Sequence, residues 1–501
     1  MGFLKENSSW HLIHCNKMKM RLQVFLSLLI AVFSTALPSA LSAQDLNGPL
    51  TLDQYFDLVL ANHPIVRQTS LLNATADAYE LKARGGFDPK LKGSFDHKSY
   101  DNKDYFTIGE VAVEVPTWYG LEVKAGFNWT EGIFLNPENN LPAAGQAQIG
   151  LTANLLQGLM IDKRRADLQQ AQIMQNRNEA ERRALVNEIL LSANEAYWDW
   201  VAANNIVGVY EEVYQLAIVR FDGLRESYIQ GYKAAVDTLE SQIQVQNRLA
   251  QLQDARLKVV ETRLKLSNYL WSRDNIPLEL SPQVPAPELD IMPVLSISND
   301  SLRQLLGMVP EQHPLLQEMG FKLDQLAVQE RLNREMLKPQ LQVNYNLLAD
   351  GFNFNAYQNG DNQAFRNILS ENYKWGASLK FPLFLRKQRA DLSLTRIKVQ
   401  ETYLKVDQKR LELQNKVNNY VNNVNTLDQQ IDQYAAMVQN YRDLLTAENE
   451  KFRLGSSSLF LLNSREQKLI ETQEKLIKAQ AKFQKSNIAV MGASGTLVDY
   501  R

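Results

Sequence analysis

A heptad repeat of apolar residues is the feature that most constrains how this chain can fold. From Leu413 to Leu445, apolar or aromatic residues recur at alternating steps of four and three. This spacing keeps one narrow stripe of an α-helix against a partner helix, as in a coiled coil. The same pattern stands earlier in the chain, from Ile189 to Phe221, at a constant offset in numbering (413 − 189 = 224). Every corresponding position is again apolar or aromatic, so the chain contains an internal duplication.

Paired landmarks extend the duplication beyond the heptads. His63 and His313, each followed by proline, differ in number by 313 − 63 = 250, whereas the two Arg-Ala-Asp-Leu stretches that begin at Arg165 and Arg389 differ by 389 − 165 = 224. The difference, 250 − 224 = 26, is the extra length of the first copy, and it lies between Pro89 and Arg165. Either an added hairpin or a long outer loop accounts for this extra length. In both cases the chain leaves the strand region in the same direction.

Alternating polar and apolar residues fill the interval before each long helix. The segments 341–347 and 375–381 show this period of two, which is the signature of a β-strand with one polar and one apolar face. We predict strands at about 90–156 in the first repeat and about 340–383 in the second. The pattern suits a membrane barrel, and it fits a half-buried soluble hairpin equally well.

Each repeat is expected to run helix, strands, long helix, tight turn and return helix. The first repeat covers 44–274 and the second 298–497, and a proline-rich linker at 275–297 joins them. The long helix and its return helix form helical hairpins, which are predicted at 157–274 and 385–492.

Gly231 and Gly455 mark the tips of these hairpins. They share the offset of the heptads (455 − 231 = 224) and stand where each long helix has to reverse. A helix commonly ends on a glycine with positive φ, so we expect both to be helix C-caps.

The N-terminal segment 1–43 has the pattern of a secretory signal peptide. Basic residues precede an apolar run at 22–37, which is too short for a transmembrane anchor, the alternative interpretation. The only cysteine, Cys15, lies ahead of that run, so we expect a mature chain without disulfides. Lysine plus arginine (54) nearly balances aspartate plus glutamate (56), which is not the basic excess of a nucleic-acid-binding protein.

Motifs of enzyme chemistry are not found in the sequence. It has no nucleotide-binding glycine loop, no Gly-x-Ser-x-Gly elbow and no His-Glu-x-x-His helix. We therefore predict a protein that is not an enzyme, with no catalytic residues, no cofactor and no metal site. His63 and His313 are interpreted as structural, with hydrogen-bonded imidazoles at a helix kink.

Several short motifs resemble those of the TolC-like outer-membrane efflux ducts. They are Asn-His-Pro at 62–64, Leu-Gln-Gly-Leu at 156–159, Tyr-Ile-Gln-Gly at 228–231 and Phe-Arg-Leu-Gly at 452–455. The resemblance covers about 50–497. It implies an α+β membrane protein in which three copies share one β-barrel in the outer membrane and one long α-helical coiled-coil barrel in the periplasm.

The resemblance also implies a function and partners. The homotrimer would be the passive export duct of a tripartite efflux or secretion system, carrying small molecules or proteins from periplasm to exterior. Its partners would be outer-membrane lipid, a periplasmic adaptor and an inner-membrane pump of the RND or ABC type, with no nucleic acid. The alternatives are a periplasmic adaptor protein, which has one hairpin and not a duplicated pair, and a structural coiled-coil protein of the envelope.

By the same resemblance, the hairpin tips form the periplasmic mouth, where the adaptor docks and the channel is gated. The residues assigned to these roles are Tyr228, Gly231, Asp237, Phe452, Gly455, Phe460 and Leu461. In similar ducts an aspartate at the position of Asp237 helps to lock the closed mouth by pairing with a neighbouring protomer.

The second tip departs from the family pattern. Ser457 stands where relatives carry an arginine, and Leu461 and Ser464 stand where relatives carry the carboxylates of a cation-binding constriction. We therefore predict a hydrophobic constriction at Phe460 and Leu461 that gates by dewetting. The alternative is that these two side chains only make packing contacts.

Overall fold

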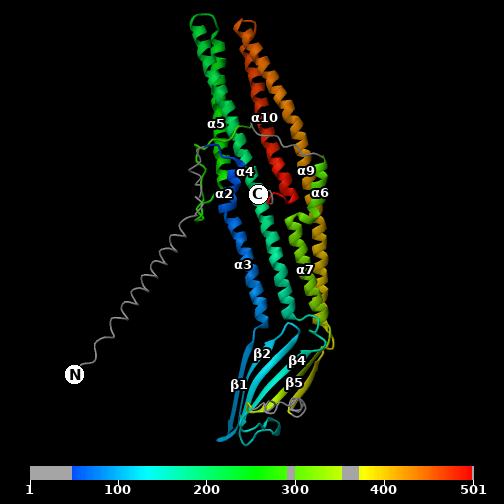
Figure 1. Ribbon diagram of the computed structural model, residues 1–501. Helices are drawn as coiled ribbons and strands as arrows, with labels where there is room; N and C mark the ends of the chain where they lie inside the picture. The colour runs from blue at the N-terminus through cyan, green and yellow to red at the C-terminus, as the bar shows by residue number, and fades with distance from the viewer. Residues whose placement is uncertain (1–47, 290–298, 353–371, 499–501) are drawn as a thin grey trace, which may run out of the picture.

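The computed structural model describes residues 48–289, 299–352 and 372–498, and Figure 1 shows an elongated molecule. The strands lie at one end and the tips of two helical hairpins lie at the other (Figure 1). The predicted signal peptide and the last part of the predicted linker fall outside the described residues. Among the residues that are described, no helix is long and apolar enough to cross a membrane.

Each repeat begins with a kinked pair of helices. The pair is α2 (Leu52–Asn62) and α3 (Pro64–Arg84) in the first repeat, and α6 (Asn299–Gln312) and α7 (Pro314–Glu335) in the second.

A histidine in extended conformation stands at each kink. Nδ1 of His63 accepts a hydrogen bond from the amide of Ile65 at 3.3 Å, and Nδ1 of His313 accepts one from Leu315 at 3.2 Å. The imidazoles are therefore N-caps of α3 and α7, which agrees with the structural role expected of them.

Two very long helices follow the strands. The first hairpin consists of α4 (Lys163–Ile229) and α5 (Ala235–Ser267), and the second of α9 (Arg386–Arg453) and α10 (Leu459–Ser494). The 67 residues of α4 and 68 residues of α9 each span about 100 Å at the α-helical rise. The helix boundaries at both tips keep the offset of the heptads (453 − 229 = 224 and 459 − 235 = 224), so the duplicated helical architecture is confirmed.

In the part of the chain that the structure describes, one antiparallel sheet of six strands joins the two repeats. The first repeat contributes β1 to β4 and the second contributes β5 and β6, in sequence order across the sheet. The strands are β1 (Lys90–Tyr100), β2 (Lys103–Pro116), β3 (Leu121–Glu131), β4 (Gln146–Asn154), β5 (Gln340–Asp350) and β6 (Tyr373–Lys380). The described part of the first repeat therefore carries its extra length as strands, which decides between the added hairpin and the long loop.

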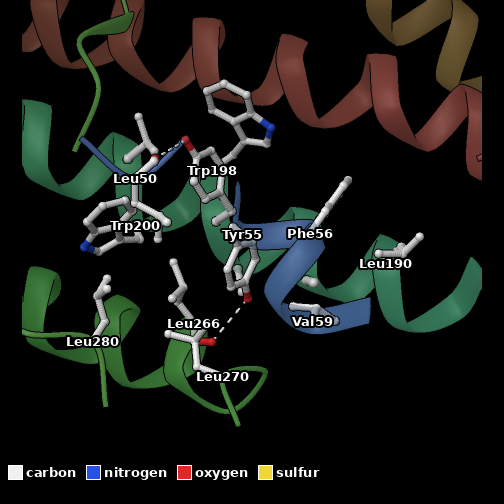
Figure 2. Packing of buried hydrophobic residues seen from close by; sticks show 14 of the residues in the cluster. Leu50, Tyr55, Phe56, Val59, Leu190, Trp198, Trp200, Leu266, Leu270 and Leu280 are labelled. Carbon is white, nitrogen blue, oxygen red and sulfur yellow. Dashed lines mark hydrogen bonds between the residues drawn. The ribbon is translucent and has the colours of Figure 1, made fainter. Parts of the chain in front are cut away.

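The largest hydrophobic cluster lies where α2 and the start of the linker pack against α4 and the end of α5 (Figure 2). Tyr55 and Tyr197 are fully buried there, and each satisfies its hydroxyl on a backbone carbonyl. Tyr55 donates to Leu266 at 3.2 Å, and Tyr197 donates to Leu50 at 2.7 Å. These bonds offset the cost of burying two phenol groups and attach the segment around Leu50 and α2 to α4 and to the end of α5.

The heptad that identified the duplication lies in a second cluster. Leu413, Val417 and Val424 of α9 are buried against Phe483 and Val490 of α10. The seam therefore faces the return helix of its own hairpin, as a coiled-coil stripe should.

Candidate functional site

The two hairpin tips have the same backbone geometry. Gly231 has φ +79° and Gly455 has φ +76°, the left-handed conformation that favours glycine. The amide of Gly231 donates to the carbonyl of Tyr228 at 2.9 Å, and that of Gly455 donates to Phe452 at 3.0 Å. Each glycine directly follows the C-cap residue of its helix, Gln230 in α4 and Leu454 in α9, and takes the positive φ expected of it.

The return helices begin differently. The hydroxyl of Ser458 accepts a hydrogen bond from the amide of Leu461 at 3.3 Å and so caps α10. The equivalent residue of the first tip is Ala234, which provides no side-chain cap for α5. Asp237 lies in the first turn of α5, where a negative charge complements the helix dipole. The ion pairs of the described residues include none to Asp237, and its pairing with a neighbouring protomer stays a prediction.

Apolar side chains gather on the surface of both tips. Phe460 is 71 % exposed and Leu461 is 42 % exposed, whereas the flanking Leu459 and Leu462 are buried. On the first tip the exposed apolar residues are Tyr228, Ile229, Tyr232, Val236 and Leu239. Of these residues, only Tyr228 belongs to the set predicted from the sequence. The constant offset between the repeats would have identified Val236 as well, because it is the counterpart of Phe460 (460 − 236 = 224).

Two polar contacts also involve tip residues. The Nζ of Lys233, on the first tip, lies 4.8 Å from the centroid of the Phe452 ring at the end of α9. The hydroxyl of Ser457 hydrogen-bonds the buried carboxylate of Glu448. Phe452 therefore links the two hairpins within one protomer, in addition to the docking role predicted for it.

Below the tips, a buried charge cluster joins the hairpins. Glu466 of α10 pairs with Arg220 of α4 at 2.6 Å and with Arg248 of α5 at 3.3 Å. The side chains of Arg248 and Glu466 are only 3 % and 4 % exposed. The sequence pattern does not predict this cluster, because the cluster is not duplicated. The equivalent positions of the other repeat hold Leu444, Thr472 and Gln242.

This arrangement presents surfaces and not reactive groups. Among the described residues, no three His, Cys, Asp or Glu side chains are grouped so as to hold a metal ion. The exposed apolar residues of the tips can contact a protein partner or narrow a passage.

Comparisons with known proteins relate this fold, in which paired helical hairpins join an antiparallel sheet, to that of outer-membrane efflux proteins. Residues 305–496 match the family model described as outer membrane efflux protein. A search of curated proteins finds no match. The second repeat thus carries the sequence pattern of this family, and the resemblance drawn from the sequence motifs is confirmed.

Solved structures of similar fold cover most of the chain. The CmeC outer membrane channel of Campylobacter jejuni matches with a TM-score of 0.64 at 14 % identity, over 89 % of this chain and 86 % of that one. VceC of Vibrio cholerae matches with a TM-score of 0.62 at 14 % identity, over 89 % and 96 %. MtrE of Neisseria gonorrhoeae matches with a TM-score of 0.64 at 13 % identity, over 89 % of each chain. CmeC and MtrE are described as outer membrane channels and VceC as an outer membrane protein, and at 13–14 % identity these matches show a shared fold.

Proposed function

We propose that the protein is the passive outer-membrane duct of a tripartite efflux or secretion system, and that it acts as a homotrimer. The observation that carries this proposal is a continuous apolar face across all six strands. Cross-strand partners follow one another in a single row through Leu91, Val113, Ala125, Ile149, Leu347 and Tyr373. Leu91, Val113 and Ile149 of this row are exposed. A sheet with such a face is suited to contact lipid.

The opposite face of the sheet is polar. Lys92 pairs with Glu114 at 2.5 Å, and Lys124 pairs with Glu110 at 2.7 Å. One apolar face and one charged face are what a barrel wall between lipid and an aqueous lumen requires. A periplasmic adaptor or a soluble coiled coil has no need of the apolar face.

Further copies of the chain would cover surfaces that one protomer leaves bare. Edge strands β1 and β6 are each paired in the sheet on one side only. The outer helices also expose apolar side chains, which are Leu249, Leu257, Val260 and Leu264 on α5 and Leu394, Ile397, Leu404 and Leu411 on α9. Exposed edges and stripes of this extent are typical of an oligomer interface, and three copies arranged in a ring are the proposed assembly.

The tips would face the periplasm and meet the adaptor, which links the duct to an inner-membrane pump of the RND or ABC type. Their exposed apolar side chains support this docking, and Phe460 with Leu461 would form the constriction. The cargo would be small molecules or proteins that leave the periplasm for the exterior.

Membrane fractionation combined with electrophoresis tests the proposal. The expected result is recovery in the outer-membrane fraction and a band that migrates as a trimer unheated and as a monomer after boiling. Recovery as a soluble periplasmic monomer would overturn the proposal and favour the adaptor or coiled-coil alternatives.

A further inference from the structure

The two free edges of the sheet are complementary in direction. In an antiparallel sheet ordered β1 to β6, the first and sixth strands run in opposite directions. An edge of eleven residues on β1 and one of eight on β6 present rows of backbone donors and acceptors without sheet partners. Long edges beside an apolar face pair readily with another chain.

We propose that β1 of one copy pairs with β6 of the next, so that three copies of six strands close an antiparallel barrel of 3 × 6 = 18 strands. This inference rests on the proposed trimeric channel and names the surface that joins its protomers. The two strands that the first repeat has beyond the second are then part of the barrel wall. An even number of strands lets every neighbour in the closed ring be antiparallel.

The register within the sheet determines which residues meet at this seam. The row of cross-strand partners that starts at Leu91 of β1 reaches Tyr373 of β6. In barrels whose strands tilt by about 35–45°, such a row climbs roughly six to nine residues over six strands. Only an even shift keeps the apolar faces of both copies on the same side. Tyr373 is therefore expected opposite His97 of the next copy, six residues beyond Leu91.

This register makes the seam apolar on its outer face. It places Trp375 opposite Phe95 and Leu379 opposite Leu91, and all four side chains are exposed in the protomer. It also lays the whole of β6 along β1 without overhang, from Tyr373 at His97 to Lys380 at Lys90. A shift of eight, the other even value in this range, would place Trp375 opposite His97.

An eighteen-stranded barrel would be wide. With strands about 4.8 Å apart and tilted as above, the backbone ring has a diameter of roughly 35 Å. Because its inner face carries the Lys92–Glu114 and Lys124–Glu110 pairs, the lumen is aqueous. An α-helix with side chains is only about 10–12 Å across, so the barrel admits hydrated cargo of polypeptide thickness and leaves size selection to the tips.

Disulfide cross-linking in a Cys15→Ser background tests the seam. The pair Phe95→Cys with Trp375→Cys probes β1 against β6, and Leu91→Cys with Leu379→Cys probes the same seam independently. Outer membranes are oxidised mildly and run without reductant. We expect a ladder of covalent dimer and trimer, at least tenfold stronger than in either single-cysteine variant and abolished by reductant. If the register shift is eight, the pair that cross-links is His97→Cys with Trp375→Cys, and this result also supports pairing of β1 with β6.

The matched control distinguishes this barrel from a smaller one. If β1 and β2 lay outside the wall, β3 would be the edge that meets β6, and the pair Phe127→Cys with Trp375→Cys would cross-link instead. That result overturns the seam and leaves the trimeric channel intact. If no pair cross-links in a protein that still migrates as a heat-modifiable trimer, pairing of β1 with β6 is likewise overturned and the trimeric channel is not. A soluble monomer would overturn the proposed function itself. Should the cysteine variants fail to assemble, an electron cryomicroscopy map of the unaltered protein decides by showing eighteen strands or fewer.

Discussion

His313 ties the stability of the second repeat to pH. Its neutral Nδ1 caps α7, and burial together with Lys409 and Lys416 lowers the pKa of the imidazole to about 4. An unfolded histidine titrates near 6.5, so between these values the unfolded chain binds the additional proton. Stability is therefore complete above about pH 6.5 and is lost as pH falls towards 4.

The variant His313→Asn keeps a capping oxygen and removes the titration. Between pH 6.5 and 4, the free energy of unfolding of this variant should fall by about 2–3 kcal/mol less than that of the unaltered chain. Urea unfolding in detergent at several pH values measures this difference. His63→Asn is the matched control at the equivalent kink: there burial alone lowers the pKa of the histidine, so its effect on the pH slope should be smaller. Parallel pH slopes for His313→Asn and the unaltered chain would exclude this linkage.

Leu461 tests the proposed constriction. If Phe460 and Leu461 close the passage by excluding water, Leu461→Asp should wet it. We expect single-channel conductance in planar bilayers to rise several-fold and to become sensitive to divalent cations. Leu444→Asp, also an exposed leucine but on α9 away from the tip, should leave conductance unchanged. Unchanged conductance in Leu461→Asp would mean that the side chain only packs.

At the scale of elements, the Arg220–Glu466–Arg248 cluster holds the two hairpins together. Glu466→Gln would leave Arg248 buried without its charge partner, and breaking a buried pair in this way costs about 3–5 kcal/mol. A lower thermal unfolding temperature in detergent is the expected readout. Glu471→Gln, on the same helix but in an exposed pair with Lys468, should cost less than about 1 kcal/mol. Equal effects of the two substitutions would argue against a special role for the cluster.

The start of each return helix gives a reciprocal pair of substitutions. Ser458→Ala should destabilise the second tip by about 1 kcal/mol, because the amide of Leu461 loses its acceptor. Ala234→Ser should stabilise the first tip by a similar amount, since it supplies the acceptor that Ala234 lacks. Hydrogen exchange of the tip amides measures both. If both variants shift protection in the same direction, the caps do not control the stability of the tips.

The sequence alone predicts the elements that occur in both repeats and the features that depend only on neighbouring residues, such as a helix that ends before a glycine. The tips were placed to the residue because Gly231 and Gly455 share a backbone requirement and an offset. The number of strands does not follow from the sequence, because Pro116 interrupts the polar–apolar alternation between β2 and β3. In addition, an added hairpin and a long loop both let the chain leave the strand region in the same direction. The Arg248–Glu466 pair was missed because its members are far apart in the chain and have no counterpart in the other repeat.

At the scale of the whole molecule, the duplicated unit is divided between two environments. The helical hairpins of both repeats have matching boundaries at their tips and the same glycine turns, while the sheet formed by the described residues draws four strands from one repeat and two from the other. The two repeats therefore differ in length mainly in their strands, whereas the long helices α4 and α9 have nearly the same length.

The unequal division of strands has a consequence for symmetry. In the proposed trimer, six hairpins of nearly equal length would give the helical end an approximate sixfold arrangement, while the strand end would be only threefold. The segments that join the two ends have to absorb this mismatch in different ways. Asp162 caps α4 with its side chain, whereas the N-cap residue of α9 is Leu385, which has a left-handed backbone and provides no side-chain cap. The junction of strand and helix is thus where the two halves of the chain cease to be copies of each other.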